Sequence, residues 1–253
     1  MAPLGVFLFF SHCQGLTLTL SEHYHKLKHM NRPFSFSVDE YYHLYTRGVD
    51  KRPVFLDERD HWRFLMLLYV CNSKPTIHLS DYGQKDLADV FSVDRGETLV
   101  DIGAYCLMPN HFHLLIREKV EGGISLFMQK LLTAYTMYFN KKYTRRGSLF
   151  EGTFMARHVA DDNYLRYLFA YIHLNPVKTI DPDGWGGKKI ANQSLAKEFL
   201  QNYRFSSYQF YLGQTRVTDG VIQKNSFPEY FADFKNFKQF IDEWVTFDEL
   251  EHI

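Results

Sequence analysis

Hydrophobic residues recur along the chain at two spacings, one typical of strands and the other of helices. Residues 41–46 form a run rich in aromatic residues, residues 99–108 form a longer apolar run, and residues 111–117 alternate between apolar and polar side chains. These three segments predict strands, and the Pro-Asn pair between the last two predicts the turn of a hairpin. A fourth, short strand is expected around residues 154–159.

Apolar residues at intervals of three and four predict three helices. The first covers residues 58–69 and begins after Asp57, which can cap its N-terminus. The second contains the apolar positions of residues 124–138. The third begins at Asp161-Asp162-Asn163, which supplies an N-cap and acidic residues for the first turn. It runs to about residue 174 and is expected to stop there because Pro176 follows.

The remaining segments are less regular. Residues 73–96 are polar and predict an insertion with one short helix, and residues 203–212 and 227–244 predict helical appendages. Strands and helices mixed in this order indicate an α+β fold, with one antiparallel sheet and helices packed on it. We therefore expect an N-terminal extension over residues 1–35, a central domain over 36–180 and a helical C-terminal appendage over 181–253.

Composition narrows the class of protein. The 253 residues are 45% hydrophobic and 23% charged, as in ordinary globular proteins. The 29 basic and 29 acidic residues cancel, so any contact with nucleic acid must come from a local basic patch. Three widely separated cysteines argue against a disulfide framework or a cysteine zinc site and suit a reducing cytoplasm. The apolar N-terminal residues make a poor signal peptide and predict no membrane-spanning helix.

His111 and His113 are the first candidates for chemistry. Alternate residues of a strand share a face, so both imidazoles lie on one side of the second hairpin strand. Two such imidazoles can bind one divalent metal ion. The same spacing also suits histidines that bind no metal, and twelve histidines make chance pairs common.

Tyr171 and Asn175 are the second candidates. They are four residues apart and share one face of the third helix. A phenol with an ordinary pKa of ~10 needs a nearby cation to act as a nucleophile, whereas an amide oxygen can be a third metal ligand. Tyr171 equally fits an apolar stripe that packs on a core, so the pattern by itself allows both roles.

A basic segment interleaved with aromatic residues follows the second helix. Lysine and arginine bind phosphates, and aromatic rings stack on bases with little sequence preference. A solvated basic loop would have the same composition. The predicted DNA contacts are Arg47, Lys141, Lys142, Tyr143, Arg145, Arg146 and Arg157.

Taken in order, several short motifs resemble those of the REP-associated tyrosine transposases, a branch of the HUH endonucleases. The resemblance extends over residues 36–212, and its specificity comes from the combination of motifs, above all M-P-N-H-x-H followed by Y-I-H-L-N-P-V-K. Many relatives carry Arg where this chain has Thr153. The matching stretches are residues 43–48 (HLYTRG), 53–57 (PVFLD), 106–115 (CLMPNHFHLL), 145–152 (RRGSLFEG), 171–178 (YIHLNPVK) and 203–208 (YRFSSY).

The resemblance implies a ferredoxin-like sheet, with residues 36–180 as an HUH catalytic domain. It implies that His111, His113 and Asn175 bind Mg²⁺ or Mn²⁺, although histidine ligands alone would favour zinc or another transition metal. It implies that Tyr171 cleaves single-stranded or hairpin DNA through a 5′-phosphotyrosine and transfers the strand without ATP. We expect a monomer or homodimer in the cytoplasm, associated with the nucleoid and not with a membrane.

Two other functions are compatible with parts of the sequence. A domesticated nucleic-acid-binding protein would keep the fold without the chemistry, which the complete set of candidate residues argues against. A metal-dependent hydrolase of nucleotides would use the two histidines without a covalent step, but it leaves the Y-I-H-L-N-P motif unexplained.

Overall fold

The computed structural model describes residues 35–78, 87–182, 190–229 and 234–246. The expected N-terminal extension over residues 1–35 lies outside the described residues except for its last one. Within the described part of the chain, no helix is long and apolar enough to cross a bilayer.

The centre of the molecule is a four-stranded antiparallel sheet. Its strands are β1 (Tyr41–Arg47), β2 (Val100–Met108), β3 (His111–Glu118) and β4 (Met155–His158), and they lie in the order β2-β3-β1-β4. Helical segments connect β1 to β2 and β3 to β4, and with these connections the strand order is that of a ferredoxin-like fold. The expected α+β class and antiparallel sheet are confirmed.

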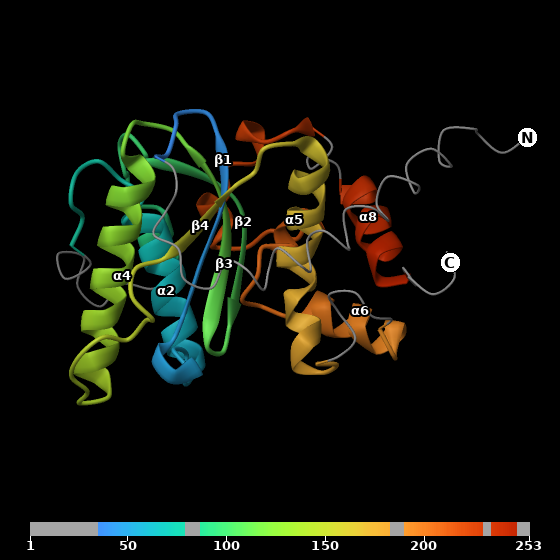
Figure 1. Cartoon of the computed structure of the whole chain (residues 1–253), viewed down its shortest axis with the longest axis horizontal. Helices are drawn as coiled ribbons and strands as arrows, with labels where there is room; N and C mark the ends of the chain where they lie inside the picture. Colours follow the sequence, from blue (N-terminus) through green and yellow to red (C-terminus); the bar gives the residue numbers. More distant parts are fainter. Residues whose placement is uncertain (1–34, 79–86, 183–189, 230–233, 247–253) are drawn as a thin grey trace, which may run out of the picture.

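Helices cover both faces of the sheet (Figure 1). Helices α2 (Glu58–Val70) and α4 (Gly123–Lys142) lie on one face, and α5 (Asp162–Leu174) lies on the other. A capping box starts α2, because the side chain of Asp57 accepts from the Asp60 backbone N–H and the Asp60 side chain accepts from that of Asp57. In the described part of the predicted insertion over residues 73–96, there is one short helix, α3 (Leu87–Phe91).

Alternation along each strand separates two sets of side chains. Phe112 of β3 points toward α2 and α4, where its ring centroid lies 4.8 Å from that of Phe64 and the aromatic cluster continues to Tyr135. His111 and His113 point to the opposite face, toward α5. The α2/α4 side is thus a hydrocarbon core, while the α5 side of the same strands carries polar groups.

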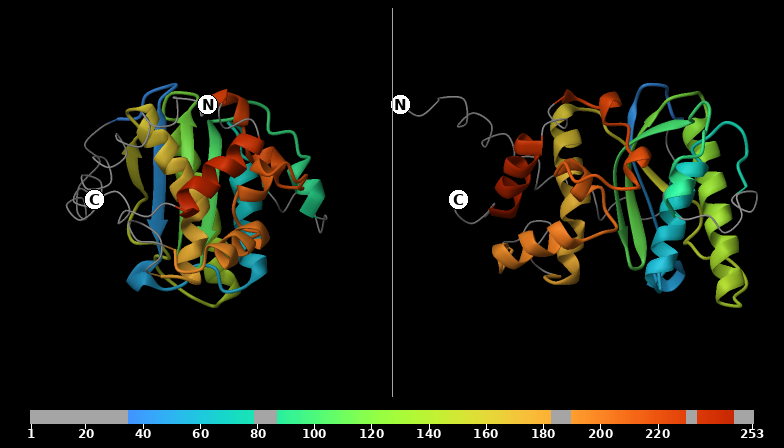
Figure 2. Two further views of the ribbon diagram at one scale, coloured as in Figure 1. Left: turned by 90° about the vertical axis from the view of Figure 1, so that its right-hand side faces the viewer. Right: turned by 180° about the vertical axis from the view of Figure 1, so that it is seen from behind.

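The C-terminal part packs outside α5, on the far side from α2 and α4 (Figures 1 and 2). Its longer helices are α6 (Gln193–Asn202) and α8 (Phe234–Thr246), and α7 (Tyr208–Tyr211) is a single turn. The expectation of a helical appendage is met by these elements. Short 3-10 turns complete the described chain: η1 (Val49–Lys51), η3 (Asn175–Thr179), η4 (Asp219–Val221) and η5 (Lys224–Ser226).

The predicted helix over residues 203–212 is wrong in its first half. Residues 203–207 run along β2 instead, where Leu107 N–H donates to the carbonyl of Phe205 and Ser207 N–H donates to that of Tyr105. The segment satisfies backbone groups at the exposed edge of β2, which would otherwise need another partner. That requirement outweighs the local preference for a helix, and only Tyr208–Tyr211 is helical.

Candidate active site

The register of the sheet places the two candidate histidines at one end of its α5 face. His111 lies opposite Arg47 of β1, and His113 lies opposite Tyr45. The two imidazole centroids are 5.0 Å apart with nearly perpendicular planes. His113 is buried, and His111 is partly exposed at the start of the strand.

Helix α5 brings Tyr171 and Asn175 to this pair. The Tyr171 ring centroid lies 5.3 Å from that of His113, in an edge-on arrangement. Asn175 ends α5 as its C-cap residue and is completely buried. Because the Asp161 side chain caps the first turn and Pro176 starts a 3-10 turn after the last, the length of α5 is fixed at both ends. Four residues that were predicted from two distant motifs therefore meet.

Several polar atoms in this cluster have no hydrogen-bond partner among the described residues. They are Nε2 of His113 and both amide atoms of Asn175, all of them buried. The ring of His111 is held through Nδ1, which lies 2.6 Å from Oδ1 of Asn110. Buried polar atoms are nearly always paired, so unpaired ones next to each other indicate a site for an additional ligand.

The donor set fits a divalent metal ion. If His111 Nδ1 donates to Asn110, His111 Nε2 keeps its lone pair, as a metal ligand must. With Nε2 of His113 and the amide oxygen of Asn175, the cluster offers two nitrogens and one oxygen. The described residues contain no group of three or more His, Cys, Asp and Glu suited to a metal, and the third donor next to the two histidines is the amide of Asn175.

Burial keeps the two imidazoles neutral. It lowers the pKa of His111 to about 4, an effect that the neighbouring amide of Asn175 opposes and the cations Lys178 and Arg47 reinforce. Burial also lowers the pKa of His113 well below its usual value. Cys106 lies opposite His113 on β2, but burial raises the pKa of its thiol, so it stays protonated and is a poor ligand.

Besides Arg47, two further cations, Lys178 and Arg157, border the cluster. The 3-10 turn after Pro176 folds Lys178 back, and its ammonium lies 4.9 Å from the ring centroid of Tyr171. Lys178 was not among the predicted site residues, although it ends the motif that contains Tyr171. Arg157 of β4, a predicted DNA contact, lies opposite His43 in the sheet, with its guanidinium carbon 4.4 Å from the ring centroid of Tyr164.

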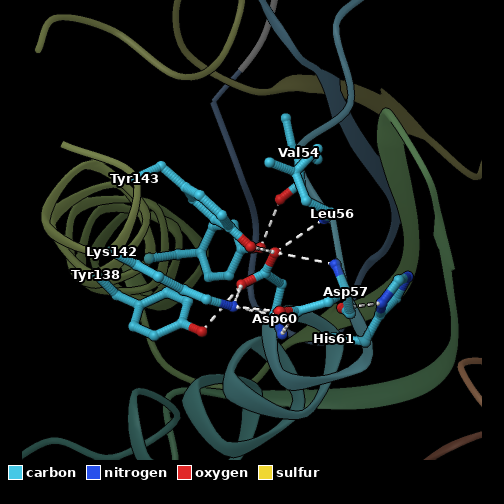
Figure 3. A network of polar contacts seen from close by, with 9 residues as sticks. Val54, Leu56, Asp57, Asp60, His61, Tyr138, Lys142 and Tyr143 are labelled. Carbon is cyan, nitrogen blue, oxygen red and sulfur yellow. Dashed lines mark hydrogen bonds and ion pairs between the residues drawn. The ribbon is translucent and has the colours of Figure 1, made fainter. Parts of the chain in front are cut away.

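Two of the predicted DNA contacts, Lys142 and Tyr143, make hydrogen bonds to acidic side chains of the protein itself (Figure 3). The ammonium of Lys142 lies 2.7 Å from a carboxylate oxygen of Asp60 and 2.8 Å from Asp57. The hydroxyls of Tyr143 and Tyr138 also donate to Asp60, whose side chain is completely buried. Burial alone would raise the pKa of Asp60, but Lys142 and these donors lower it. The network joins the start of α2 to the end of α4.

The other predicted contacts differ in their surroundings. Arg145 donates to the side chain of Asn140 and to the Ser148 carbonyl, so it shapes the loop after α4. Arg47 pairs with Glu151 at 2.9 Å on the surface. Lys141 and Arg146 are exposed. Backbone hydrogen bonds from Val49 and Glu151 hold this loop against the end of β1, the same end of the sheet at which His111 lies.

His173 has a structural role within the motif of Tyr171. It is completely buried, its Nδ1 donates to the carbonyl of Phe169, and its Nε2 accepts from the hydroxyl of Ser207. Ser207 in turn accepts from the Tyr105 N–H on β2. The motif over residues 203–208 thus fastens the C-terminal segment to α5 and to the sheet.

Part of the chain is similar to a known protein family. Residues 65–175 match the family model described as "Transposase IS200 like". A solved structure of a REP-associated tyrosine transposase bound to a REP hairpin aligns with a TM-score of 0.45 and 12% identity, covering 75% of this chain and 90% of that chain. No curated protein matches. The matched span contains His111, His113, Tyr171 and Asn175, and over this span the chain is similar in sequence to IS200-like transposases.

Proposed function

We propose that this protein is a transposase-type endonuclease and strand transferase that cleaves single-stranded DNA with Tyr171 as the nucleophile. The observation that supports this function best is the convergence of Tyr171, His111, His113 and Asn175 from two separate elements. Unpaired buried atoms at their meeting point are expected where a ligand completes the site. The family match over these residues supports the same reaction class.

In this proposal, His111, His113 and Asn175 hold a divalent ion. When bound, the ion polarises the scissile phosphate and offsets the negative charge that builds on its oxygens. Mn²⁺ is the ion to test first because it accepts both imidazole nitrogen and amide oxygen, and Mg²⁺ is the second. Asn110 assists by orienting the His111 ring through its 2.6 Å hydrogen bond.

The covalent step conserves the number of phosphate ester bonds. Oη of Tyr171 loses its proton and bonds to the phosphorus, the bond from phosphorus to the 3′ oxygen breaks, and that oxygen takes up a proton. A 5′-phosphotyrosine and a free 3′-hydroxyl result. Attack on the phosphotyrosine by this hydroxyl, or by one on another strand, reverses the step, so strand transfer requires no ATP.

The two bordering cations support this chemistry. The ammonium of Lys178 lies 4.9 Å from the ring centroid of Tyr171, so it places a positive charge beside the phosphate that Tyr171 would attack. Arg157 lies on the same face of the sheet and can contact a phosphate on the flanking DNA. Exposed Lys141 and Arg146 extend positive charge along the same end of the molecule. Lys142 is assigned to the internal network with Asp60 and not to DNA.

The alternative of a domesticated, catalytically silent DNA-binding protein has less support. Loss of catalysis removes the selection that keeps a buried, unpaired amide such as Asn175 in place, since such groups lower stability. A hydrolase without a covalent step has no use for a tyrosine held beside the two histidines.

Covalent capture of DNA tests the proposal. The full chain would be incubated with Mn²⁺ and a DNA hairpin with single-stranded flanks, taken from an inverted repeat beside the gene and labelled at its 3′ end. A labelled band at the size of protein plus DNA on a denaturing gel is the expected result. Tyr171→Phe should abolish the band, and His111→Ala should abolish it in the same way.

Tyr167→Phe is the matched control, because Tyr167 lies one turn away on α5 and its ring centroid is 6.0 Å from that of Tyr171. It should form the adduct as the wild type does. An adduct that persists in Tyr171→Phe would contradict the assignment of the nucleophile. Binding without any adduct, with Mn²⁺ or with Mg²⁺, would favour the domesticated alternative.

A further inference from the structure

A third histidine, His43, lies behind the candidate metal site and was not among the predicted site residues. It is on β1, points to the same face of the sheet as His113, and is one diagonal step from it across the β1–β3 ladder. Only 4% of its surface is exposed. Its Nε2 lies 2.9 Å from Nδ1 of His113, a normal hydrogen-bond distance.

The distance between the two nitrogens determines how the proton is shared. Two N–H groups would collide at 2.9 Å and two lone pairs would repel, so one nitrogen carries the proton and the other accepts it. The opposite nitrogen of His113, Nε2, is buried and has no partner among the described residues. A proton on Nε2 would be a buried unpaired donor, whereas a lone pair there suits a metal ion. The proton of His113 therefore belongs on Nδ1, and His43 Nε2 accepts it.

We propose that His43 is a positioning residue that fixes the tautomer and ring orientation of His113, so that Nε2 of His113 presents its lone pair to the metal ion. This inference rests on the proposed metal site. Histidine ligands commonly donate their second ring N–H to an acceptor, and loss of that acceptor weakens metal binding by about 10- to 100-fold. Here the acceptor is another imidazole in place of a carboxylate or a backbone carbonyl, which adds no charge to the site.

His43 is suited to this role because its own ring is held on several sides. Its centroid is 4.8 Å from that of Tyr45 and 6.1 Å from that of Tyr171. Its Nε2 is directed at His113 and is used by that hydrogen bond, so it is not directed at the shared metal position. His43 thus acts on the ion through His113.

Two substitutions separate the hydrogen bond from the space that the ring fills. His43→Phe keeps an aromatic ring and removes the acceptor, whereas His43→Gln places an amide oxygen near the position of Nε2 and keeps an acceptor. Mn²⁺ binding to the full chain would be measured without DNA, by the electron paramagnetic resonance signal of free Mn²⁺. His43→Phe should weaken binding by roughly 10- to 100-fold, and His43→Gln should stay within a few-fold of the wild type.

His61→Phe is the matched control, because His61 is stacked between the rings of Phe55 and Phe205 in a different part of the molecule. It should leave Mn²⁺ affinity unchanged. Nitrogen-15 spectra of selectively labelled histidine in the metal-free protein give a second measurement, and they should show His113 protonated on Nδ1.

The outcomes distinguish this inference from the proposed function. Wild-type protein that binds no Mn²⁺ would contradict the metal site itself. Wild-type binding with unchanged affinity in His43→Phe, or His113 protonated on Nε2, would overturn the role of His43 alone. If Mn²⁺ binding were weakened equally in His43→Phe, His43→Gln and His61→Phe, the effect would come from general packing. That result would also overturn the positioning role of His43.

Discussion

The buried amide of Asn175 lies beside the His111 ring, but neither of its polar atoms makes a hydrogen bond of normal geometry among the described residues, and a buried polar group in that state costs roughly 1–3 kcal/mol. Asn175→Leu keeps the branched shape of the side chain and removes the polar atoms. We expect the free energy of unfolding without metal to stay the same or to rise by up to about 2 kcal/mol. The stabilisation that Mn²⁺ gives the wild type should disappear. Urea unfolding with and without Mn²⁺ measures both quantities.

Asn175→Leu should thus keep or raise the stability of the metal-free protein while it removes the stabilisation by Mn²⁺. Replacing a residue with a purely structural role would lower the stability of the metal-free protein. Asn175→Gln is the comparison, since it keeps the amide but lengthens the side chain. A large loss of stability in metal-free Asn175→Leu would show that the amide is paired in the folded protein and would contradict its assignment as a ligand.

The candidate site contains residues that could be predicted from the sequence and residues that could not. The two groups differ in what places them at the site. His111, His113, Tyr171 and Asn175 lie two or four positions apart within their elements, so periodicity alone pairs them. His43 and Lys178 act on them through the strand register and through a turn after Pro176. Lys178 is near Tyr171 in sequence, but no strand or helix periodicity pairs the two residues. His43 becomes a neighbour of His113 only when β1 pairs with β3.

At the level of elements, the segments with strong periodicity were predicted well. The hairpin of β2 and β3, the helices α2, α4 and α5, and the Asp57 and Asp161 caps all occur where expected. Residues 203–207 were predicted wrongly as helix because their partner, the edge of β2, is about a hundred residues away. Helix α6 lies within the predicted helical appendage but was given no bounds of its own, since only two of its residues are buried and its apolar stripe is correspondingly short.

The contact between α2 and α4 depends on Asp60. Its side chain accepts from Lys142, Tyr138, Tyr143 and the Leu56 backbone, and it is completely buried. Asp60→Ala leaves these donors unpaired, and removing one member of a buried ion pair costs about 3–5 kcal/mol. We expect the free energy of unfolding to fall by roughly 3 kcal/mol in urea denaturation.

Asp162→Ala is the control for the loss of one acidic charge. Asp162 forms an ion pair with Arg166 one turn away on the surface of α5, and such pairs contribute less than about 1 kcal/mol. If the two substitutions cost the same, the network around Asp60 would not be the clamp between α2 and α4 that the structure indicates.

The contact between α5 and the C-terminal segment should depend on pH through His173. Burial lowers the pKa of this histidine to about 3, against 6.5 when it is exposed. The unfolded chain therefore binds one more proton between these values, so the stability is complete above pH 6.5 and falls as the pH drops toward 3. A second N–H on His173 also ends its acceptance from Ser207.

His173→Gln keeps an acceptor for Ser207 but does not titrate. Between pH 4 and 6, the free energy of unfolding should depend on pH less steeply than in the wild type, by about 1.4 kcal/mol per pH unit. Urea denaturation at several pH values measures this slope. The same substitution at His78, which is exposed, should leave the wild-type slope, and an unchanged slope in His173→Gln would show that His173 is not the titrating group.

For DNA binding by the molecule as a whole, the position of the exposed positive charges matters more than the net charge. The net charge is zero, so electrostatic attraction to DNA must come from local clusters of positive charge. Exposed Lys141 and Arg146 lie in the segment held against the end of β1, near the His111 end of the sheet. Lys119 and Lys224 are exposed too, but Lys119 directly follows β3 at the opposite end of the sheet, and η5, which contains Lys224, contacts Tyr41 there.

This arrangement predicts how salt affects DNA binding. Each phosphate contact contributes about 0.7 to the slope of log affinity against log salt for single-stranded DNA and about 0.9 for a duplex. Replacing both Lys141 and Arg146 with Gln should therefore make the slope shallower by about 1.4 to 1.8. Replacing both Lys119 and Lys224 with Gln changes the net charge equally and should leave the slope as it is. Fluorescence anisotropy of a labelled hairpin at several salt concentrations measures all three slopes. Equal slopes for the two double variants would mean that DNA binding does not use the His111 end of the sheet, and the path of the DNA past Tyr171 would have to lie elsewhere.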